Sequence, residues 1–321
     1  MPPGVLCSGN IVHDTVVHPV EEVVFGAVAW VESIEQHMGG NGANTACALA
    51  RLGVPVRLTG MVGSDAAGQQ LLRALESAGV DTRAVARSVA PTPASVSLVN
   101  KRGERCLLHR PGASLEAFAE PLQFTPALLE GAAHYHLANM FALPNLRRHG
   151  ARMLRRARAA GMSTSLDTAW DAHGRWLEDL GPALAFVDLL FVNETEARCL
   201  SGAEEPAAAA AFFRRFGVRD VAVKLGERGC AVFTADASIG VPAFDVPVVD
   251  TTGAGDCFAG AFLAAWLRGQ PLAEAARFAN AAAALTIQRL GSTGGLRSWA
   301  QTLEWMKTAP VRPAPFSRGS V

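Results

Sequence analysis

The chain has 321 residues, half of them apolar, so it is long enough to bury a large core in one to three domains. Its 29 basic residues balance 29 acidic ones, and the formal net charge at pH 7 is zero. This balance argues against a nucleic-acid partner. The six cysteines have no metal-binding spacing and most lie in apolar runs, which is typical of reduced core residues in a cytoplasmic protein.

The first residues of the chain predict a strand and not a signal peptide. The N-terminus, from Met1 to Gly4, has no basic region and leads into a strand. The longest apolar run, near residues 278–287, is too short to span a bilayer. We therefore expect a soluble protein that stays in the cytoplasm. Residues 311–321 mix proline, serine and glycine without periodicity, which predicts a flexible tail.

The first third of the chain combines a buried strand with segments typical of edge strands. Val5 to Cys7 predicts the buried strand, and the polar loop after it reaches Asp14. Open α/β sheets bind ligands at the carboxyl ends of their strands, so Asp14 is either a ligand contact or an ordinary turn carboxylate. Residues 15–38 alternate Val and Trp without a helical stripe and predict edge strands. Residues 94–110 predict a matching hairpin around a glycine-containing turn.

Strands and helices alternate through the middle of the chain. Apolar runs predict strands at 57–62, 134–137, 163–167, 189–193 and 220–224. Helical periodicity predicts helices near 66–78, 145–160, 194–201 and 206–216. This order indicates an α/β fold in which helices cover both faces of a mostly parallel sheet.

Two glycine clusters each run directly into a predicted helix. The first, Gly39 to Gly42, opens a helix that ends at Gly53. The second follows a strand-like run, Phe244 to Val249, and opens an Ala-rich helix at residues 253–256. Free N–H groups at a helix N-terminus favour an anion, and glycine lets a phosphate come close.

Asp256 stands out in the second cluster because a carboxylate beside a phosphate site is electrostatically unfavourable. It becomes useful if it accepts the proton of a hydroxyl that attacks phosphorus. The alternative reading is a helix with an acidic residue in its first turn and glycines that serve packing.

Together, the two clusters resemble both signatures of the PfkB (ribokinase-like) carbohydrate kinase family. The first signature runs from Gly39 through Asn44, Gly53 and Gly63, and the second from Asp250 through Asp256 and Gly260. The resemblance extends from Gly9 to about Gly295. It implies a ribokinase-like three-layer α/β sandwich with a mostly parallel central sheet, formed by one domain over residues 1–310. It also implies a small β lid over the sugar site, from about 15–38 and 94–110, which family members often use to form a homodimer.

The family resemblance implies ATP-dependent phosphorylation of a primary hydroxyl of a small sugar, with Mg²⁺. Asp256 would be the general base, beside an anion hole made by the backbone N–H groups of Gly253, Ala254, Gly255 and Asp256. The residues implied for the acceptor are Asp14, Gly40, Asn41, Gly42, Asn44 and Asn139.

Three further segments resemble the family's nucleotide site. Asn193 to Glu196 is similar to the NxxE motif, which implies Asn193 near the phosphates and Glu196 holding Mg²⁺ through water; the alternative is an N-cap with an acidic first turn. The segment from Lys224 to Gly229 is similar to the nucleotide-binding turn and contributes Lys224, Gly226 and Gly229; an ordinary β-turn is the alternative. Asn280 matches a nucleotide contact, or it caps a buried group.

Related kinases also bind a monovalent cation, largely through backbone carbonyls. The resemblance places such a K⁺ site near Asp250, Thr252, Thr286, Arg289 and Gly291.

The acceptor itself is left open by the sequence. Val12 stands where ribokinase proper has Asn, and Asn41 stands where it has Lys. His109 and Arg110, at the end of the predicted lid, either recognise an acidic sugar or are solvated strand-end charges. A nucleoside kinase and a non-catalytic sugar-binding protein of the same fold are the alternative functions.

Two other nucleotide-binding classes fail on motif placement. No GxGxxG follows the first strand, as a dinucleotide-binding oxidoreductase requires. The chain also contains no Gly-Lys dipeptide, as a P-loop would require.

Overall fold

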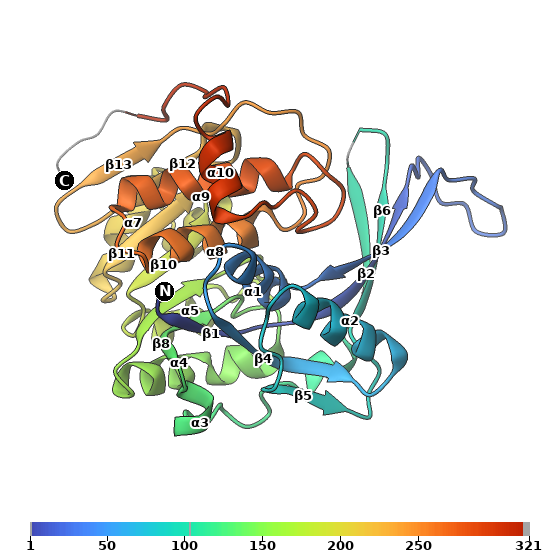
Figure 1. Cartoon of the computed structure of the whole chain (residues 1–321), viewed down its shortest axis with the longest axis horizontal. Coiled ribbons are helices and arrows are strands. Elements are labelled where there is room, and N and C mark those ends of the chain that lie inside the picture. The colour runs from blue at the N-terminus through green and yellow to red at the C-terminus, as the bar shows by residue number, and fades with distance from the viewer. Residues whose placement is uncertain (1, 103, 317–321) are drawn as a thin grey trace.

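The computed structural model describes residues 2–102 and 104–316 and has two sheets of unequal size (Figure 1). The large sheet has nine strands in the order β13-β12-β11-β10-β9-β8-β1-β4-β5. Their bounds are β1 Gly4–Ser8, β4 Val56–Gly63, β5 Val85–Ser88, β8 Ala132–Leu137, β9 Ser163–Asp167, β10 Leu189–Asn193, β11 Asp220–Lys224, β12 Cys230–Phe233 and β13 Ser238–Val241.

Seven neighbouring strands of the large sheet run parallel, in the order β11-β10-β9-β8-β1-β4-β5. At one edge, β12 and β13 add antiparallel pairs. The predicted mostly parallel sheet is therefore confirmed. Since parallel strands end on the same edge, the last residues of β9, β10 and β11 come together there: Asp167, Asn193 and Lys224. Ligands bind at this edge in open α/β sheets.

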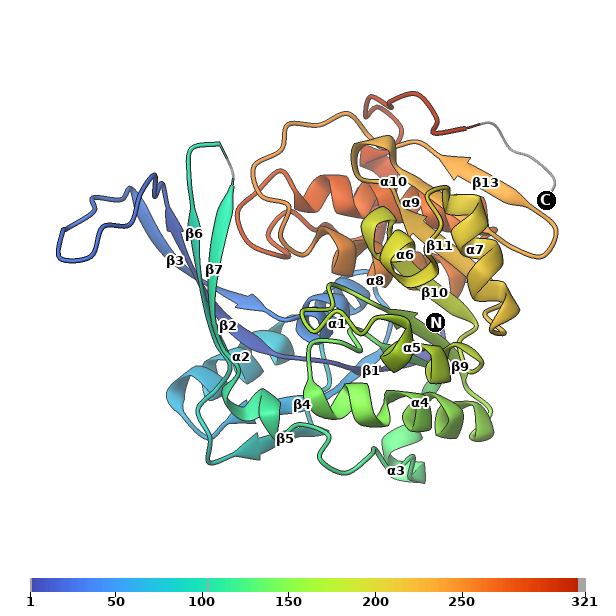
Figure 2. The ribbon, with the colours of Figure 1, turned by 180° about the vertical axis from the view of Figure 1, so that it is seen from behind.

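Helices cover both faces of the large sheet, as Figures 1 and 2 show from opposite sides. One apolar core joins the sheet to α1 Asn41–Arg51, α2 Ala66–Ser77, α8 Ala254–Trp266 and α9 Leu272–Thr286. A second core joins it to α4 Pro144–Ala159, α5 Leu177–Leu184, α6 Glu194–Ser201 and α7 Pro206–Arg215. The short helices α3 Pro126–Leu129 and α10 Trp299–Trp305 and the 3₁₀ turns η1 Gly112–Leu115 and η2 Gly226–Arg228 complete the layers. The predicted three-layer α/β arrangement is confirmed.

The two glycine-initiated helices, α1 and α8, pack closely against each other. A Cβ atom on Gly260 of α8 would lie only 2.7 Å from the Cβ atom of Ala48 on α1. Small residues let helix axes approach, so Gly260 serves packing here. This contact brings the N-terminal turns of α1 and α8 side by side.

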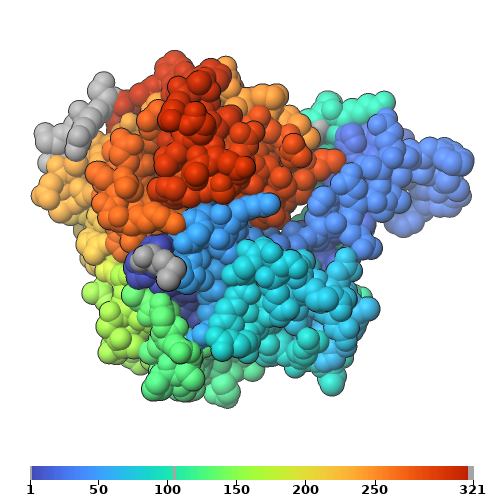
Figure 3. All heavy atoms as spheres, in the orientation of Figure 1, coloured from blue at the N-terminus to red at the C-terminus, as the bar shows by residue number. Residues whose placement is uncertain are grey.

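The small sheet projects from one side of the molecule (Figure 3). Its order is β3-β2-β6-β7, with bounds β2 Val12–His18, β3 Ser33–Gly39, β6 Ala94–Val99 and β7 Arg105–Arg110. The predicted hairpin at 94–110 is confirmed. The strand prediction is wrong for residues 19–32, which form a loop between β2 and β3. Pro19 has no N–H to donate to a sheet, and the apolar side chains in this loop find no core: Trp30 is 92 % exposed.

The strand predicted over residues 244–249 is also wrong. Only Phe244 pairs, in an isolated bridge with Val311, and Pro247 lacks the N–H that a continued ladder would need. The partner of Phe244 lies in the segment expected to be flexible. Residues 311–316 of that segment pack on the body: Arg312 donates its backbone N–H to the Ala243 carbonyl at 2.9 Å. Residues 317–321 lie outside the described part of the chain.

Among the residues that the structure describes, no helix is both long and apolar enough to cross a bilayer.

Candidate active site

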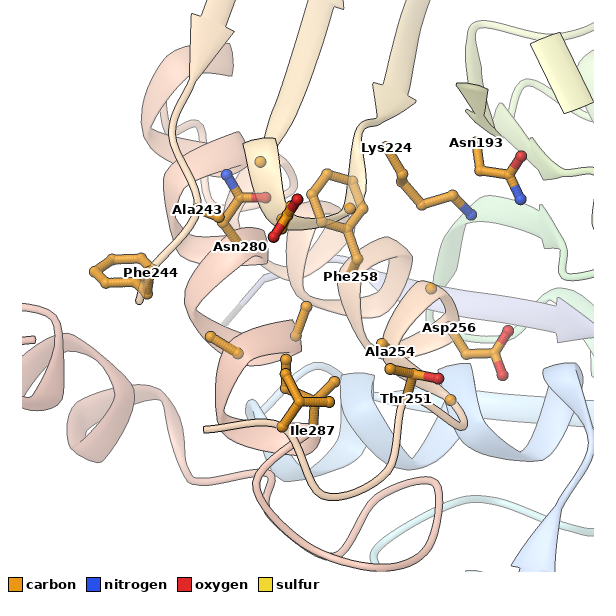
Figure 4. A pocket seen from close by; sticks show the side chains of 18 of the residues that line it. Asn193, Lys224, Ala243, Phe244, Thr251, Ala254, Asp256, Phe258, Asn280 and Ile287 are labelled. Atoms are coloured by element: carbon orange, nitrogen blue, oxygen red, sulfur yellow. The ribbon is translucent and has the colours of Figure 1, made fainter. Parts of the chain in front are cut away.

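A cavity of about 590 Å³ opens at the carboxyl edge of the large sheet, beside the first turn of α8 (Figure 4). Its two ends differ in chemistry. The polar end is lined by Asn41, Asp167, Asn193, Glu196, Lys224 and Asp256. The apolar end is lined by residues that include Phe244, Val246, Ala283, Ala284 and Ile287. One end can therefore hold charged groups, and the other a flat apolar ring.

The N-terminus of α8 is shaped by Gly253, the helix N-cap. Its φ of 74° lies in the left-handed region, and a Cβ atom there would collide with the backbone carbonyl of Ser292. No side chain caps this helix end; the Ala254 N–H donates to the Thr251 carbonyl at 3.3 Å, and the N–H groups of Gly255 and Asp256 are left to face the cavity. The residues predicted to form the anion hole, Gly253 to Asp256, all line the cavity. Their arrangement suits a phosphate oxygen.

Asp256 is buried in the first turn of α8 and receives two hydrogen bonds from α1. Asn41 Nδ2 donates to Oδ1 at 2.7 Å, and Asn44 Nδ2 donates to Oδ2 at 2.7 Å. Two predicted site residues of α1 thus meet Asp256, which lies 215 positions after Asn41 and 212 positions after Asn44 in the chain.

The orientation of the Asn41 amide follows from its neighbour Asn139. Asn139 Oδ1 accepts the backbone N–H groups of Phe141 and Ala142, so its Nδ2 must be the atom that donates to Asn41 Oδ1 at 2.8 Å. Asn41 must then present its own Nδ2 to Asp256. The chain of donors therefore points toward the carboxylate.

The protonation state of Asp256 reflects two opposing effects. Burial raises the pKa of the carboxyl above its usual value, while the hydrogen bonds from Asn44 and Asn41 lower it. Both oxygens accept amide N–H groups, which favours the ionised form. A buried carboxylate with a raised pKa is suited to take up a proton.

Glu196 lines the same cavity and is held by three donors. The Asn193 backbone N–H donates to Oε2 at 2.9 Å, the Asn193 amide donates to Oε1 at 2.7 Å, and Thr168 Oγ1 donates to Oε2 at 2.8 Å. The predicted N-cap is present as a full capping box, with Asn193 Oδ1 accepting from Glu196 N. The N-cap alternative is therefore confirmed, and the same two residues line the cavity, while the roles of Asn193 at the phosphates and Glu196 at Mg²⁺ stay predictions.

Asp167 is a site residue that the sequence reasoning missed. It ends β9, is buried, and accepts Lys224 Nζ at 2.9 Å on both carboxylate oxygens. Burial raises the pKa of Asp167 to about 7, against the lowering effect of Lys224. The signal was available: Asp167 is the last residue of a predicted apolar strand, at the same sheet edge as Asn193 and Lys224.

The turn after β11 and Asn280 shape the middle of the cavity. Gly226 and Gly229 have φ values of 60° and 97°, and a Cβ on Gly229 would collide with the Val241 carbonyl. Asn280 Nδ2 donates to the carbonyls of Val241, at 3.1 Å, and Pro242, at 2.9 Å. The predicted nucleotide residues therefore line one cavity, and Asn280 also satisfies a buried backbone turn.

Arg312, in the C-terminal segment, lines the cavity near its apolar end and was also missed. Its guanidinium pairs with Glu227 at 2.7 Å and with Asp245 at 3.0 Å, which ties the η2 turn to the segment after β13. Its sequence context is a proline-rich stretch without periodicity, which gave no signal.

The residues predicted for a monovalent cation lie on two adjoining loops. Asp250 accepts the backbone N–H groups of Thr252 at 2.9 Å and Gly291 at 3.0 Å, and Thr286 Oγ1 donates to the Ala282 carbonyl. Arg289 donates its N–H to the Thr286 carbonyl at 3.3 Å. Within the described ranges, no group of three or more His, Cys, Asp or Glu side chains could hold a metal ion. The K⁺ site near Asp250 and Gly291 therefore stays a prediction.

Close backbone contacts explain why glycines stand at positions 40 and 42, two residues predicted for the acceptor site. Gly40 has a φ of 94°, and its Cβ would lie 2.5 Å from the Asn10 carbonyl; a Cβ on Gly42 would lie 2.7 Å from the Gly9 Cα. Asn10 Oδ1 accepts the Asn41 backbone N–H at 2.9 Å, which makes Asn10 a further positioning residue. These close contacts fix the N-terminus of α1.

One face of the lid carries Asp14 together with polar neighbours. Strand register sets Asp14 opposite His37 and Ser95, and Ser95 Oγ lies 3.1 Å from His109 Nδ1. His37 packs against Gly291, so this face is turned toward the α8 side of the molecule. Arg110 lies one residue further along β7 and therefore points to the opposite face, where it donates to the Thr92 carbonyl at 3.0 Å. Of the two lid-end candidates, only His109 shares a face with Asp14.

Comparison with known proteins identifies the family to which this geometry belongs. The family model for pfkB carbohydrate kinases matches residues 4–299. The chain belongs to the pfkB family of carbohydrate kinases. The kinase is 37 % identical over 291 residues to the ATP-dependent ribose-1-phosphate kinase of Halopiger xanaduensis, which covers 90 % of this chain and 93 % of that protein. It is 31 % identical over 277 residues to the ribokinase of Haemophilus influenzae, covering 84 % and 88 % of the two chains.

Structural comparison agrees with this assignment. The Arabidopsis thaliana ribokinase, solved in complex with ribose and ATP, superposes with a TM-score of 0.82 at 28 % identity, over 96 % of this chain and 99 % of that chain. The protein is thus an ATP-dependent carbohydrate kinase with a ribokinase-like fold.

Proposed function

We propose that this kinase transfers the γ-phosphoryl group of ATP to a primary hydroxyl of a small sugar, with Asp256 as general base. The observation that carries the proposal is that a buried Asp256, held by two amide donors, lies in one cavity with the N-terminus of α8, which no side chain caps. The carboxylate would accept the hydroxyl proton while the N–H groups of residues 253–256 stabilise the charge on the phosphoryl oxygens.

The two ends of the cavity support the orientation of ATP. The adenine would lie at the apolar end, near Phe244 and Ile287, and the phosphates would extend toward Asn193 and the α8 N-terminus. Glu196 would hold Mg²⁺ through water, which suits an ion that keeps most of its water ligands. Bound Mg²⁺ would neutralise phosphate charge during transfer.

The acceptor would bind between the lid and the N-terminus of α1. Asp14, Asn41, Asn44 and Asn139 would bind sugar hydroxyls beside Asp256, where Gly40 and Gly42 let the backbone come close. The names of two relatives, a ribose-1-phosphate kinase and a ribokinase, favour a ribose ring as the acceptor. His37 and His109 on the Asp14 face add groups that can donate to an acidic substituent.

Acceptor identity is tested by ADP release with ATP and Mg²⁺, with and without K⁺, across a panel of sugars. The panel contains ribose, ribose 1-phosphate, hexoses, ketodeoxy sugar acids and nucleosides. We expect turnover with a ribose-based acceptor, and acceleration by K⁺ if the loops near Asp250 and Gly291 bind it. Turnover confined to nucleosides would replace the sugar-kinase reading with a nucleoside kinase. ATP binding without any turnover would support the non-catalytic alternative.

We also propose that the lid mediates a homodimer. Its β2–β3 loop exposes large apolar side chains that the monomer leaves uncovered: Phe25 is 99 % and Trp30 is 92 % exposed. A patch of this kind is typical of an interaction site. We expect a dimer in sedimentation velocity and a monomer for Phe25→Ser/Trp30→Ser. Trp170→Ser, which removes an exposed aromatic ring outside the lid, is the matched control. A wild-type monomer at all concentrations tested would contradict this proposal.

A further inference from the structure

Lys224 and Asp167 form a buried ion pair that crosses the strand between them. Lys224 ends β11 and Asp167 ends β9, with β10 in the middle of the three. The ammonium lies 2.9 Å from each carboxylate oxygen. Both side chains are largely shielded, with 17 % of the lysine and 6 % of the aspartate exposed. A buried pair of this kind is held in one geometry.

The ammonium of Lys224 also lies over the N-terminal turn of α8. A Cβ atom placed on Gly255 would come within 3.3 Å of Lys224 Nζ, which shows how closely the ammonium approaches this turn. Figure 4 shows Lys224 reaching from its strand into the cavity on the same side as Asn193 and Asp256. Two positive features, a charged amine and the free N–H groups of a helix end, thus meet at one place.

The charge balance of the cavity singles out Lys224. The described acidic residues at the polar end are Asp167, Glu196 and Asp256. Burial lowers the pKa of Lys224, but these three carboxylates outweigh it and raise the pKa above its usual value. Arg312 is the other described Lys or Arg side chain in the cavity lining; it lies near the apolar end and is engaged by Glu227 and Asp245. A triphosphate entering the polar end meets a single side-chain cation in the described lining, and that cation is Lys224.

We propose, building on the kinase function above, that Lys224 binds the transferring phosphoryl group directly and that Asp167 is the residue that positions it. Lys224 donates one N–H to a γ-phosphate oxygen while others stay on Asp167, since an ammonium has three donors. The added charge opposes the build-up of negative charge between the phosphoryl group and the ionised Asp256. Asp167 aims the flexible lysine side chain at the α8 N-terminus.

Affinity for two nucleotides tests the contact without relying on turnover. The probes are AMP-PNP, which keeps a γ-phosphate, and ADP, which lacks one, measured by calorimetry with Mg²⁺. Lys224→Met alone leaves Asp167 as an unpaired buried charge and is prone to misfold. The decisive variant is therefore Lys224→Met/Asp167→Asn, which removes both charges. Arg312→Met is the matched control, because it removes a cation from the other end of the same cavity.

For the double variant we expect the affinity for AMP-PNP to fall about 10- to 100-fold, because a charge-assisted hydrogen bond to the γ-phosphate is lost. The affinity for ADP should change by less than about threefold, because ADP has no γ-phosphate. We also expect kcat to fall by about 10²- to 10³-fold with little change in the acceptor KM. Lys224→Arg keeps a cation at this position and should therefore retain part of the AMP-PNP affinity that the double variant loses. Asp167→Asn alone should lower kcat less than the double variant while keeping the γ-phosphate preference.

Equal losses for AMP-PNP and ADP, or none, would overturn the Lys224 inference while leaving the Asp256 mechanism intact. Failure of the proposed function is a separate result: the wild-type protein would then transfer no phosphoryl group to any acceptor, whatever Lys224 contributes to nucleotide binding. A loss of AMP-PNP affinity as large in Arg312→Met would also overturn the inference, since it would assign the effect to net charge.

Discussion

Asp256→Asn is expected to lower kcat by about 10²- to 10⁴-fold while the KM values for ATP and for the acceptor stay within about threefold. The reason is local. The substitution keeps the shape of a side chain that lies between Asn41 and Asn44, but it removes the group that takes the proton. Steady-state kinetics at saturating ATP and acceptor measure the change, with thermal unfolding to confirm that the variant is folded.

Asp188→Asn is the matched control for this substitution. Asp188 is also buried and also accepts hydrogen bonds, from the Thr164 backbone and hydroxyl, but it precedes β10 at the opposite edge of the sheet. We expect a similar loss of stability and an unchanged kcat. Equal losses of kcat in the two variants would show that any buried charge lost from this fold lowers turnover, and Asp256 would then not be the base.

Gly253→Ala should show the second largest effect, a fall in kcat of about 10²- to 10³-fold. Gly253 has a φ of 74°, and an added Cβ would collide with the Ser292 carbonyl, so the first turn of α8 must shift. The N–H groups that face the phosphoryl group shift with it. Single-turnover kinetics, in which enzyme saturated with acceptor is mixed with ATP, would separate a slower transfer step from a loss of binding.

Gly269→Ala provides the control for backbone strain. Gly269 has a similar φ of 78°, but nothing lies within 4 Å of the position its Cβ would take. Both variants should lose about 1–2 kcal/mol of stability from the left-handed conformation. Only Gly253→Ala should also lose turnover. A kcat for Gly253→Ala no lower than that of Gly269→Ala would contradict an anion hole at the N-terminus of α8.

Sequence patterns predicted the parts of the fold that depend on local order. The parallel strands follow from apolar runs separated by helical segments. The two helix starts follow from glycine clusters that run directly into helix-forming segments. The strand prediction failed for residues 19–32 because alternating Val and Trp suggest a sheet whether or not a core exists to cover them. The strand prediction failed for Phe244 to Val249 because Pro247 has no N–H for the hydrogen bonds of a strand pair.

The site was predictable where a motif carries its own chemistry, and not where pairing depends on topology. Asn41, Asn44 and Asp256 stand in the two motifs that carry the family resemblance, so the resemblance implied that they share one site. Asp167 could be linked to Lys224 only once the order β11-β10-β9 was known. Arg312 reaches the cavity through a bridge between Val311 and Phe244, which no local pattern encodes.

Locating the phosphorus in the product tests the central claim most directly. Wild-type enzyme, ATP, Mg²⁺ and the acceptor that gives turnover would be followed by ³¹P NMR with proton correlation. Transfer to a primary hydroxyl predicts a phosphomonoester signal that correlates with the protons of an exocyclic methylene group and grows in step with ADP. A new phosphomonoester signal, absent from the acceptor itself, that correlates with a single ring proton, or release of inorganic phosphate alone, would contradict the proposed reaction.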